Sequence, residues 1–557
     1  MGIAGVMALT FMSGCSQAQP SGTGAPVDSG PVTPKVSRFV FAVSAPPLES
    51  NRPAVAASTS FWVLMPMYEN LIGASETGQE MVPMLAERWA IEPDGKSYRF
   101  NLRRGVKFHD DKGEFTAKDV HYSWQANKNE TDPLRPTQPL TVMNQIKEVE
   151  IPNDYELVMR LDRPDSGFLL AISLAENTFP IMSKADGETR PPPTMLDKPL
   201  AGTGPYRYVG RAQGEWVRYQ RGPDKHWRQT PEFPEFEWRY IKEDSTRQAA
   251  LMSREVQAAA LPPDLTRQAE QAGLKIIAGK APGLHVFMTF LGVWINQRLT
   301  QQEVLNSDPN AAWIFPNTPL FDVRVRRALN KAVDRDAMNK AFLKGKGDPI
   351  YLEYFHPTRP GWNPEWEKRF KDSYGYDPEA AKKLLAEAGY GPGRPLSTTI
   401  QLRPYGYFPA AMEMDEAVQN YWRAIGVDVK LEQKDSVEFT AKSRRAEYDN
   451  HSYVVVTSAR AMTGIGAYNG MHLLNRGGVQ LPELAELFKE IQIAVDPKKN
   501  NELWRKWGDI AYEQYINLPL FWVPSEATVD PNVVADYVFP GSISGTYTHV
   551  EYLKAQR

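Results

Sequence analysis

Short apolar segments alternate with amphipathic helical segments in the second half of this 557-residue chain, and this alternation constrains the fold more than any other feature. Gly426 follows one of the expected helices at the position where a left-handed residue ends many helices. The pattern predicts an α/β lobe in which helices cover a sheet. Strands are expected at 398–403, 427–432, 452–457 and 519–523, and helices at 323–342, 378–388, 410–425, 482–495 and 497–514.

The first half of the chain is richer in strand signals. Residues 38–43 (RFVFAV) are typical of a buried strand, and Asp94-Gly95 predicts a tight hairpin, because glycine accepts a positive φ without steric cost. A capped helix is expected to begin after Thr116, and another helix is expected over 60–73. The run 282–297 (PGLHVFMTFLGVWINQ) is predicted to be a buried strand that crosses into a second lobe.

The only cysteine of the chain, Cys15, lies directly after an apolar segment of signal-peptide character. The tetrad Met12-Ser13-Gly14-Cys15 resembles a bacterial lipobox, in which the cysteine is acylated after the preceding peptide is removed. Residues 16–37 are mostly Ser, Gly, Pro, Gln, Thr and Ala, a composition typical of a flexible tether. The alternative is an apolar terminus with a free thiol. With one cysteine, no intrachain disulfide and no multi-cysteine metal site can form.

Composition and motifs exclude several classes of function. A formal net charge of -3 argues against nucleic-acid binding, which needs concentrated positive charge. Motifs of zinc proteases, serine hydrolases and phosphate-binding glycine loops are absent from the sequence. The densest group of acidic and imidazole side chains, His109 to Asp111 with His121, is a weak metal candidate. We therefore expect no cofactor, no metal and no catalytic residues.

A set of sequence blocks, in a fixed order along the chain, resembles the extracellular solute-binding proteins of the oligopeptide, dipeptide and nickel type, called family 5. Each block also has a structural interpretation, such as the tight loop that Gly202-Thr-Gly-Pro-Tyr206 would form before a strand. The blocks therefore identify a fold rather than a binding site. They are Tyr68–Leu71, Leu85–Trp89, Asp94-Gly95, Tyr98–His109, Phe115–Ser123, Gly202–Tyr206, Phe321–Arg335, Tyr376–Gly389 and Tyr421–Val429.

The resemblance implies an α/β, two-lobed periplasmic-binding-protein fold (type II-like, cluster C) with an extra subdomain inserted in the first lobe. Two such lobes close around a solute by hinge motion. The expected boundaries are a signal peptide at 1–14, a lipidated cysteine and tether at 15–37, lobe I at 38–66, 178–284 and 519–557, the inserted subdomain at 67–177, and lobe II at 285–518.

The resemblance also implies the substrate-binding component of an ABC importer. Such a protein captures a peptide or another small organic solute between its lobes and delivers it to the permease subunits. We expect a periplasmic or extracytoplasmic monomer that meets the membrane only through its lipid anchor. Two alternatives stay open: an export-compartment hydrolase on the same scaffold, and a signalling or adhesion lipoprotein that has lost transport.

Four segments are expected to line the ligand site: 42–62, 284–296, 401–407 and 457–463. Trp62, Trp294 and Tyr405 are candidate apolar walls, although each also fits a packing role. In peptide-binding relatives, the loop after the strand at 452–457 carries an aspartate that pairs with the peptide amino group. Here that loop has Thr457, Ser458 and Arg460 without an acid, so we hypothesise that Arg460 contacts an anionic group of the ligand. The alternative for Arg460 is a structural salt bridge or a solvent-facing side chain.

Overall fold

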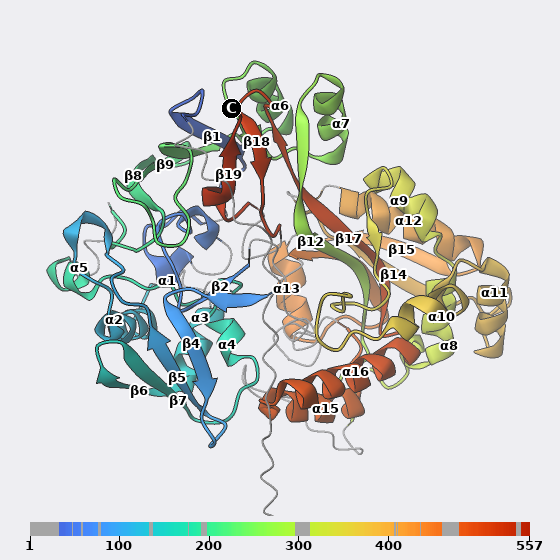
Figure 1. Cartoon of the computed structure of the whole chain (residues 1–557). Helices are drawn as coiled ribbons and strands as arrows, with labels where there is room; N and C mark the ends of the chain where they lie inside the picture. The colour runs from blue at the N-terminus through green and yellow to red at the C-terminus, as the bar shows by residue number, and fades with distance from the viewer. Residues whose placement is uncertain are drawn as a thin grey trace, which may run out of the picture.

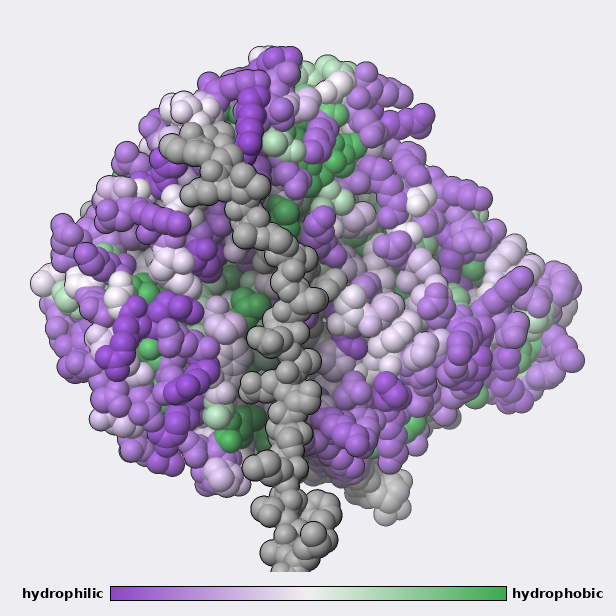
Figure 2. All heavy atoms as spheres, viewed as in Figure 1, coloured by the Kyte–Doolittle hydropathy of each residue, from purple (hydrophilic) through white to green (hydrophobic). Residues whose placement is uncertain are grey.

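The computed structural model describes residues 33–46, 48–56, 60–75, 80–132, 137–176, 178–190, 198–295, 312–405, 408, 410–434, 436–458, 478–541 and 547–557. It has two lobes joined by long strands, and Figure 1 shows one lobe mostly in blue to green, with the red strands near the C-terminus, and the other mostly in yellow to orange-red. Most of the face drawn in Figure 2 is hydrophilic, and several hydrophobic patches lie near the boundary between the lobes.

One large sheet runs through both lobes in the order β15-β14-β16-β12-β17-β11-β1-β10-β9-β8, and β13 (Asp348–Pro349) pairs with β17. Its two central strands, β12 (Lys275–Leu291) and β17 (Asn517–Val529), pair antiparallel over most of their length. Strands usually have about 5–6 residues, so strands of 17 and 13 residues are long enough to belong to both lobes. The predicted crossing strand is confirmed, but it begins at Lys275 and ends at Leu291, both earlier than the expected 282 and 297.

The first lobe is built around β1 (Arg38–Val43), whose residues after Arg38 are all buried. β1 pairs parallel with β10 (Glu235–Tyr240) and β11 (Ala258–Ala259). Aromatic side chains on one face, among them Phe39, Phe41 and Trp238, form its core. The lobe is completed by β8 (Tyr206–Ala212), β9 (Trp216–Arg221), β18 (Val534–Tyr537), β19 (Leu553–Ala555), and the helices α1 (Pro53–Ala56), α5 (Lys184–Thr189), α6 (Asp244–Met252) and α7 (Pro263–Gln271).

A separate four-stranded antiparallel sheet lies beside the first lobe, with a hydrophobic cluster of its own. The predicted hairpin is present, with Gly95 at φ 69° between the first two strands. The predicted helix cap is confirmed as well, because Thr116 and Asp119 form a reciprocal capping box. The strands, in sheet order, are β4 (Ala86–Ile91), β5 (Ser97–Leu102), β7 (Glu156–Leu161) and β6 (Ile146–Asn153), and the adjoining elements are β2 (Ile72–Ala74), β3 (Met81–Pro83), α2 (Ala117–Lys128), α3 (Thr137–Gln145) and α4 (Phe168–Ala171).

The second lobe contains the predicted α/β unit. Strand β14 (Ser397–Leu402) pairs parallel with β15 (Asp428–Gln433) and, over a shorter stretch, with β16 (His451–Ser458). Helix α12 (Ala410–Ala424) connects β14 to β15, as a parallel crossover requires. The other helices are α8 (Val323–Lys331), α9 (Arg335–Leu343), α10 (Pro364–Tyr374), α11 (Pro378–Glu387), α13 (Ser436–Arg444), α15 (Pro482–Ile493) and α16 (Pro497–Glu513).

Two helix predictions were wrong. Over 60–73 there is only a short 3-10 turn, Phe61–Val63, before strand β2. The carbonyl groups of Pro66 and Met67 accept hydrogen bonds from the backbone of the 204–206 loop, so they are not available to a helix. The expected helix at 323–342 is two helices, because the Asp334 side chain accepts the N–H of Ala337 and begins α9.

Candidate functional site

The carboxyl ends of β14 and β16 lie at the same edge of the second lobe, since the strands are parallel. Their pairing ends at Ile400 opposite Ser452, although β16 continues to Ser458 and stays paired with β12 there. We call the region where β14 and β16 no longer pair with each other, residues 401–405 and 454–458, the β14–β16 split. In open α/β sheets, ligands bind at the carboxyl ends of strands where neighbouring strands part. The split is therefore the first place to look for a ligand site.

Arg403 directly follows β14, and aromatic rings surround its guanidinium group. The central guanidinium carbon lies 5.3 Å from the ring centre of Tyr405, 5.2 Å from that of Phe439 and 5.9 Å from that of Tyr453. Within the part of the chain that the structure describes, no carboxylate lies within ion-pair distance of Arg403. A planar cation held among rings and without an internal counter-ion can bind a carboxylate through two parallel hydrogen bonds.

Tyr405, a predicted site residue, lies in the split. Its hydroxyl group donates to the backbone carbonyl of Val454 on β16, at 3.3 Å. The side chain is 9% exposed and packs with the core of the second lobe. Tyr405 thus joins the segment after β14 to β16 and contributes a ring beside Arg403.

Thr457, another predicted site residue, lies opposite His285 on the crossing strand β12. The His285 ring stacks on Trp522 of β17, with ring centres 4.5 Å apart and planes 21° apart, and its Nε2 accepts the N–H of Tyr354 at 3.3 Å. Burial lowers the pKa of His285 well below its usual range, and the positive charge of Arg359 adds to this shift. His285 is therefore a neutral ring that fixes the segment around Tyr354 against the crossing strands.

The backbone of Tyr354 is in the left-handed region, with φ 66°, which is uncommon for a bulky residue. Its neighbour Glu353 is buried, and burial raises the pKa of this carboxyl well above its usual range, while a hydrogen bond with the Tyr354 side chain opposes the shift. Backbone strain of this kind often accompanies functional sites. The 353–354 segment therefore holds a neutral acid and an unusual backbone beside the crossing strands.

Arg359, like Arg403, carries a positive charge, and it lies beside the 353–354 segment. Its guanidinium lies 5.0 Å from the ring centre of Trp522, and its Nη1 donates to the carbonyl of Tyr354 at 3.3 Å. Burial lowers the pKa of Arg359 to about 10, so the group stays charged at pH 7. Trp522 is thus held between an imidazole ring and a guanidinium group.

Trp294 packs behind the rings that contact Arg403. It has no exposed surface, and its Nε1 donates to the carbonyl of Gly478 at 3.1 Å. It belongs to the same hydrophobic cluster as Phe439 and Tyr453. Its ring therefore lies within the core of the second lobe and has no surface open to a ligand in this structure.

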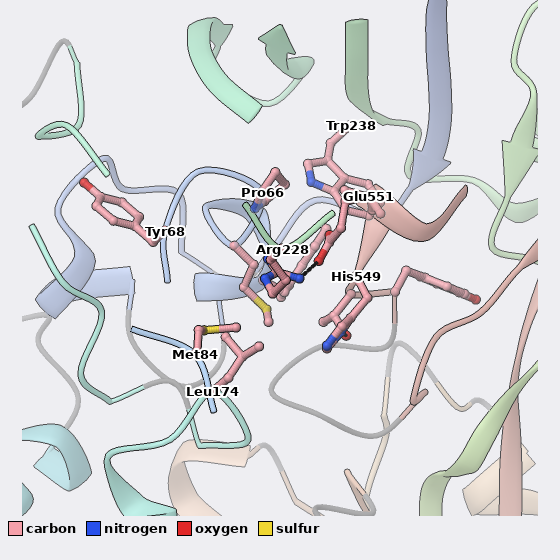
Figure 3. Close-up of a pocket in the computed structure, with 13 residues that line it drawn as sticks. Pro66, Tyr68, Met84, Leu174, Arg228, Trp238, His549 and Glu551 are labelled. Atoms are coloured by element: carbon pink, nitrogen blue, oxygen red, sulfur yellow. Dashed lines mark hydrogen bonds and ion pairs between the residues drawn. The ribbon is translucent and has the colours of Figure 1, made fainter. Parts of the chain in front are cut away.

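Trp62 lies in a different place, a small pocket of the first lobe shown in Figure 3. Its ring meets Trp238 edge to face, with centres 4.9 Å apart. The pocket is bordered by the first lobe, by Met84 and Leu174, and by the C-terminal segment 547–551. Trp238 is fully buried and, among the described residues, its Nε1 has no hydrogen-bond partner.

The charged groups of this pocket pair with one another. Arg228 forms an ion pair with Glu69, at 3.0 Å. It forms another with Glu551, which Figure 3 marks with a dashed line. Burial, the largest single effect, would raise the pKa of Glu551, but the charges of Arg228 and His549 and the hydrogen bond from Arg228 together hold the pKa below its usual range. This buried pair ties the C-terminal segment to the first lobe.

Several predicted residues lie outside the description. Arg460 belongs to 459–477 and Cys15 to 1–32, and neither range is described. Ser458 ends β16 opposite Leu284, but nothing is described of its side chain. Their predicted roles stay predictions.

The segments expected from the sequence include the β14–β16 split, but most of the residues that pack there and beside the crossing strands were not singled out from the sequence. Arg403 and His285 lie inside the segments 401–407 and 284–296, yet neither was singled out. Trp522, Tyr354 and Arg359 carried no local signal, because they reach His285 only through the pairing of β12 with β17 and the loop that covers it.

The described residues contain no helix of sufficient length and apolar character to span a membrane. They also contain no group of three or more His, Cys, Asp and Glu placed to hold a metal ion. In the histidine and acid cluster noted in the sequence, His109 Nε2 bonds the carbonyl of Gly204 at 2.8 Å.

Two lobes joined by crossing strands, with a split parallel sheet beside them, define the class of two-lobed binding proteins. The model of bacterial extracellular solute-binding proteins, family 5 Middle, matches residues 80–474. The chain belongs to this family, and it is the substrate-binding component of an ABC importer.

Known proteins agree with this assignment. The chain is 29% identical to a dipeptide-binding protein of Escherichia coli over 402 residues, 69% of each chain. It is 27% identical to heme-binding protein A of Haemophilus influenzae over 429 residues, 73% of this chain and 72% of the relative. Among solved structures, the periplasmic binding protein DppA from Helicobacter pylori in complex with the peptide STSA has a TM-score of 0.69 at 22% identity, and the match covers 93% of this chain and 98% of that one.

Proposed function

We propose that this protein binds a short peptide, or another small organic solute with a carboxylate, at the β14–β16 split and delivers it to the permease. The observation that carries this proposal is the guanidinium group of Arg403, held among three aromatic rings without a carboxylate partner in the described residues. The rings supply apolar surface, and the cation supplies a fixed point for a carboxylate. Relatives named for dipeptides and di/tripeptides support the peptide class.

Arg460 is proposed as a second anion-binding group, together with Thr457 and Ser458 at the end of β16. The three residues follow the strand that borders the split, and the sequence there has no acid to pair with a peptide amino group. We expect Arg460→Ala to weaken binding by about tenfold, the effect of losing one charged hydrogen bond. An unchanged affinity would mean that Arg460 faces solvent or a structural partner.

We further propose that the protein is a lipoprotein and works as a monomer. Acylation of Cys15 would hold it at the membrane surface through the tether of 16–37. The proposed division is lobe I at 38–66, 178–284 and 519–557, an inserted subdomain at 67–177 that includes the four-stranded sheet, and lobe II at 285–518. Cys15→Ser should move the protein from the membrane fraction to the soluble fraction.

Calorimetric titration of the protein with dipeptides and with their C-terminally amidated forms tests the ligand class. The free carboxylate should bind at least about tenfold more tightly than the amide, and Arg403→Met should remove this preference. Arg369→Met, which removes an exposed arginine paired with Glu513 in the same lobe, serves as the control. Equal binding of acid and amide forms would contradict the carboxylate contact. The ligand should be recovered intact, because a hydrolysed ligand would favour the enzyme alternative.

A further inference from the structure

Asp415 is a fully buried carboxyl group on α12, directly beside the β14–β16 split. Its Oδ1 accepts the backbone N–H of Val454 at 2.9 Å. Its Oδ2 is buried and, among the described residues, has no hydrogen-bond partner. A buried acid with one unused oxygen costs stability, so its presence needs a reason.

Val454 stands where β14 and β16 stop pairing. In a parallel ladder, alternate residues of a strand direct their N–H and C=O groups toward the same neighbour. The carbonyl of Asn450 accepts the N–H of Thr399, and the last pair of the ladder joins Ile400 to Ser452. The next residue of β16 that faces β14 is therefore Val454.

Both backbone groups of Val454 are bonded to side chains instead of to β14. The N–H group donates to Asp415, and the carbonyl accepts the hydroxyl group of Tyr405 at 3.3 Å. An unpaired buried backbone group costs about as much as a lost hydrogen bond. The two side chains thus allow β14 to leave β16 without that cost.

We propose that Asp415 is a positioning residue for ligand binding. Its side chain accepts the Val454 hydrogen bond that a carbonyl of β14 would accept if the two strands stayed paired, and so it keeps the C-terminal ends of β14 and β16 apart. The split carries Arg403 and Tyr405 on one side and the end of β16 on the other. Asp415 contacts no ligand in this proposal and acts through β16 and Tyr405. The predicted effect of Asp415 on ligand binding rests on the proposed ligand site at Arg403.

The environment of Asp415 favours its neutral form. Burial raises the pKa of Asp415 well above its usual range, the charge of Glu416 adds to the shift, and the Val454 N–H bond opposes it. Burial raises the pKa of Tyr453 of β16, which lies near enough for a charge on Asp415 to add to the shift, and Tyr405 bonds the same residue as Asp415, Val454. No cation of the described chain forms an ion pair with Asp415. A neutral carboxyl has the shape of an amide, so Asp415→Asn should keep the Oδ1 bond to Val454.

Two variants and a control test the proposal. The readouts are hydrogen exchange of the Val454 amide and binding of the dipeptide Met-Leu. Asp415→Ala should raise the Val454 exchange rate and weaken Met-Leu binding, each by about tenfold, the effect of losing about 1.4 kcal/mol. Asp415→Asn should leave both within about twofold. The control Gln419→Ala removes another α12 bond, from Nε2 to the carbonyl of Val429 at 3.0 Å, on the β15 side. It should lower Tm and change neither readout.

Unchanged Val454 exchange in Asp415→Ala, or equal losses in Asp415→Asn and Asp415→Ala, would overturn the proposal. If the wild type does not bind Met-Leu, the peptide proposal fails. The Val454 exchange rates still decide whether Asp415 takes the place of the missing β14–β16 hydrogen bond. If Asp415→Ala does not fold, Asp415→Asn carries the test. Its stability relative to the wild type should rise as the pH increases above about 4, because the unfolded wild-type carboxyl then ionises while the folded one keeps its proton. A constant difference would contradict the buried neutral acid.

Discussion

The hydroxyl group of Ser166 donates a hydrogen bond to the carbonyl oxygen of Ile491, 2.7 Å away in the last turn of α15. The N–H group of Ser166 also donates to the carbonyl of Gln492, at 2.8 Å. Ser166 lies just before α4, beside the four-stranded sheet, whereas α15 belongs to the second lobe. Figure 1 shows α4 and α15 near each other at the lower end of the molecule, away from the crossing strands β12 and β17. The two lobes are therefore joined on both sides of the region between them.

Ser166→Ala should favour the open arrangement of the lobes. The substitution removes one of the two bonds across the boundary, worth about 0.5–1.5 kcal/mol, so the closed population should fall by about 2- to 10-fold relative to the open one. Ligand affinity should fall by the same factor where the open form predominates, because binding needs the closed form. Small-angle scattering without ligand and calorimetry with it measure the two effects.

Ser173→Ala is the matched control for this prediction. The Ser173 hydroxyl donates to the carbonyl of Leu170 within the same part of the molecule, at 2.8 Å, and does not cross the boundary. This variant should lose stability without a change in radius of gyration. Equal radii of gyration for the wild type and Ser166→Ala would show that the Ser166 contact does not stabilise the closed arrangement of the lobes.

Arg228→Met should destabilise the protein by about 3–5 kcal/mol at pH 7, because Glu69 and Glu551 would be left as buried carboxylates without their cation. The loss should be smaller at pH 4.5. In the wild type, the lowered pKa of Glu551 gives stability above its unfolded value, near 4.3, that is lost as the pH falls toward the folded value. Without Arg228, burial favours the protonated form of Glu551, so the loss of stability in the variant is smaller at the lower pH.

Denaturant unfolding at both pH values measures this difference. Lys368→Ala, which breaks the exposed pair with Glu365, should have little effect at either pH. A pH-independent loss in Arg228→Met would point to lost packing of the arginine side chain instead.

His285→Phe should make the protein less sensitive to mild acid. The folded wild type keeps His285 neutral, while the unfolded chain protonates it below about pH 6.5, so wild-type stability rises with pH in this range. Between pH 7 and pH 5 this one residue should account for up to about 2 kcal/mol, which the variant does not lose.

The variant should also be less stable at pH 7, because the N–H of Tyr354 loses its acceptor while the stacking on Trp522 is kept. Unfolding curves at pH 5 and pH 7 give the comparison. His109 and His356, whose pKa values burial lowers to about 4, contribute equally in both proteins. Parallel pH dependences would contradict a neutral, buried His285.

The successful predictions from sequence depend on neighbours along the chain. The Asp94-Gly95 turn, the Thr116–Asp119 capping box and strand β1 each need only a few adjacent residues, and all three are present. One failed prediction involves a distant partner, and the other involves a local helix cap. The 60–73 segment is held out of a helix by the 204–206 loop, and an apolar stripe that continues past Asp334 hides the break between α8 and α9.

The sequence alone determined the α/β character of the second lobe, the crossing strand and the family, because these are carried by periodicity and by ordered blocks of residues. Only the tertiary structure brought together the residues of the candidate site. Arg403, His285 and Trp522 come from three distant parts of the chain, and Asp415 has a role only because the ladder between β14 and β16 ends at Ser452. The physical reason is that strand pairing and burial, which bring these side chains together and shift their pKa values, depend on contacts between residues far apart in sequence.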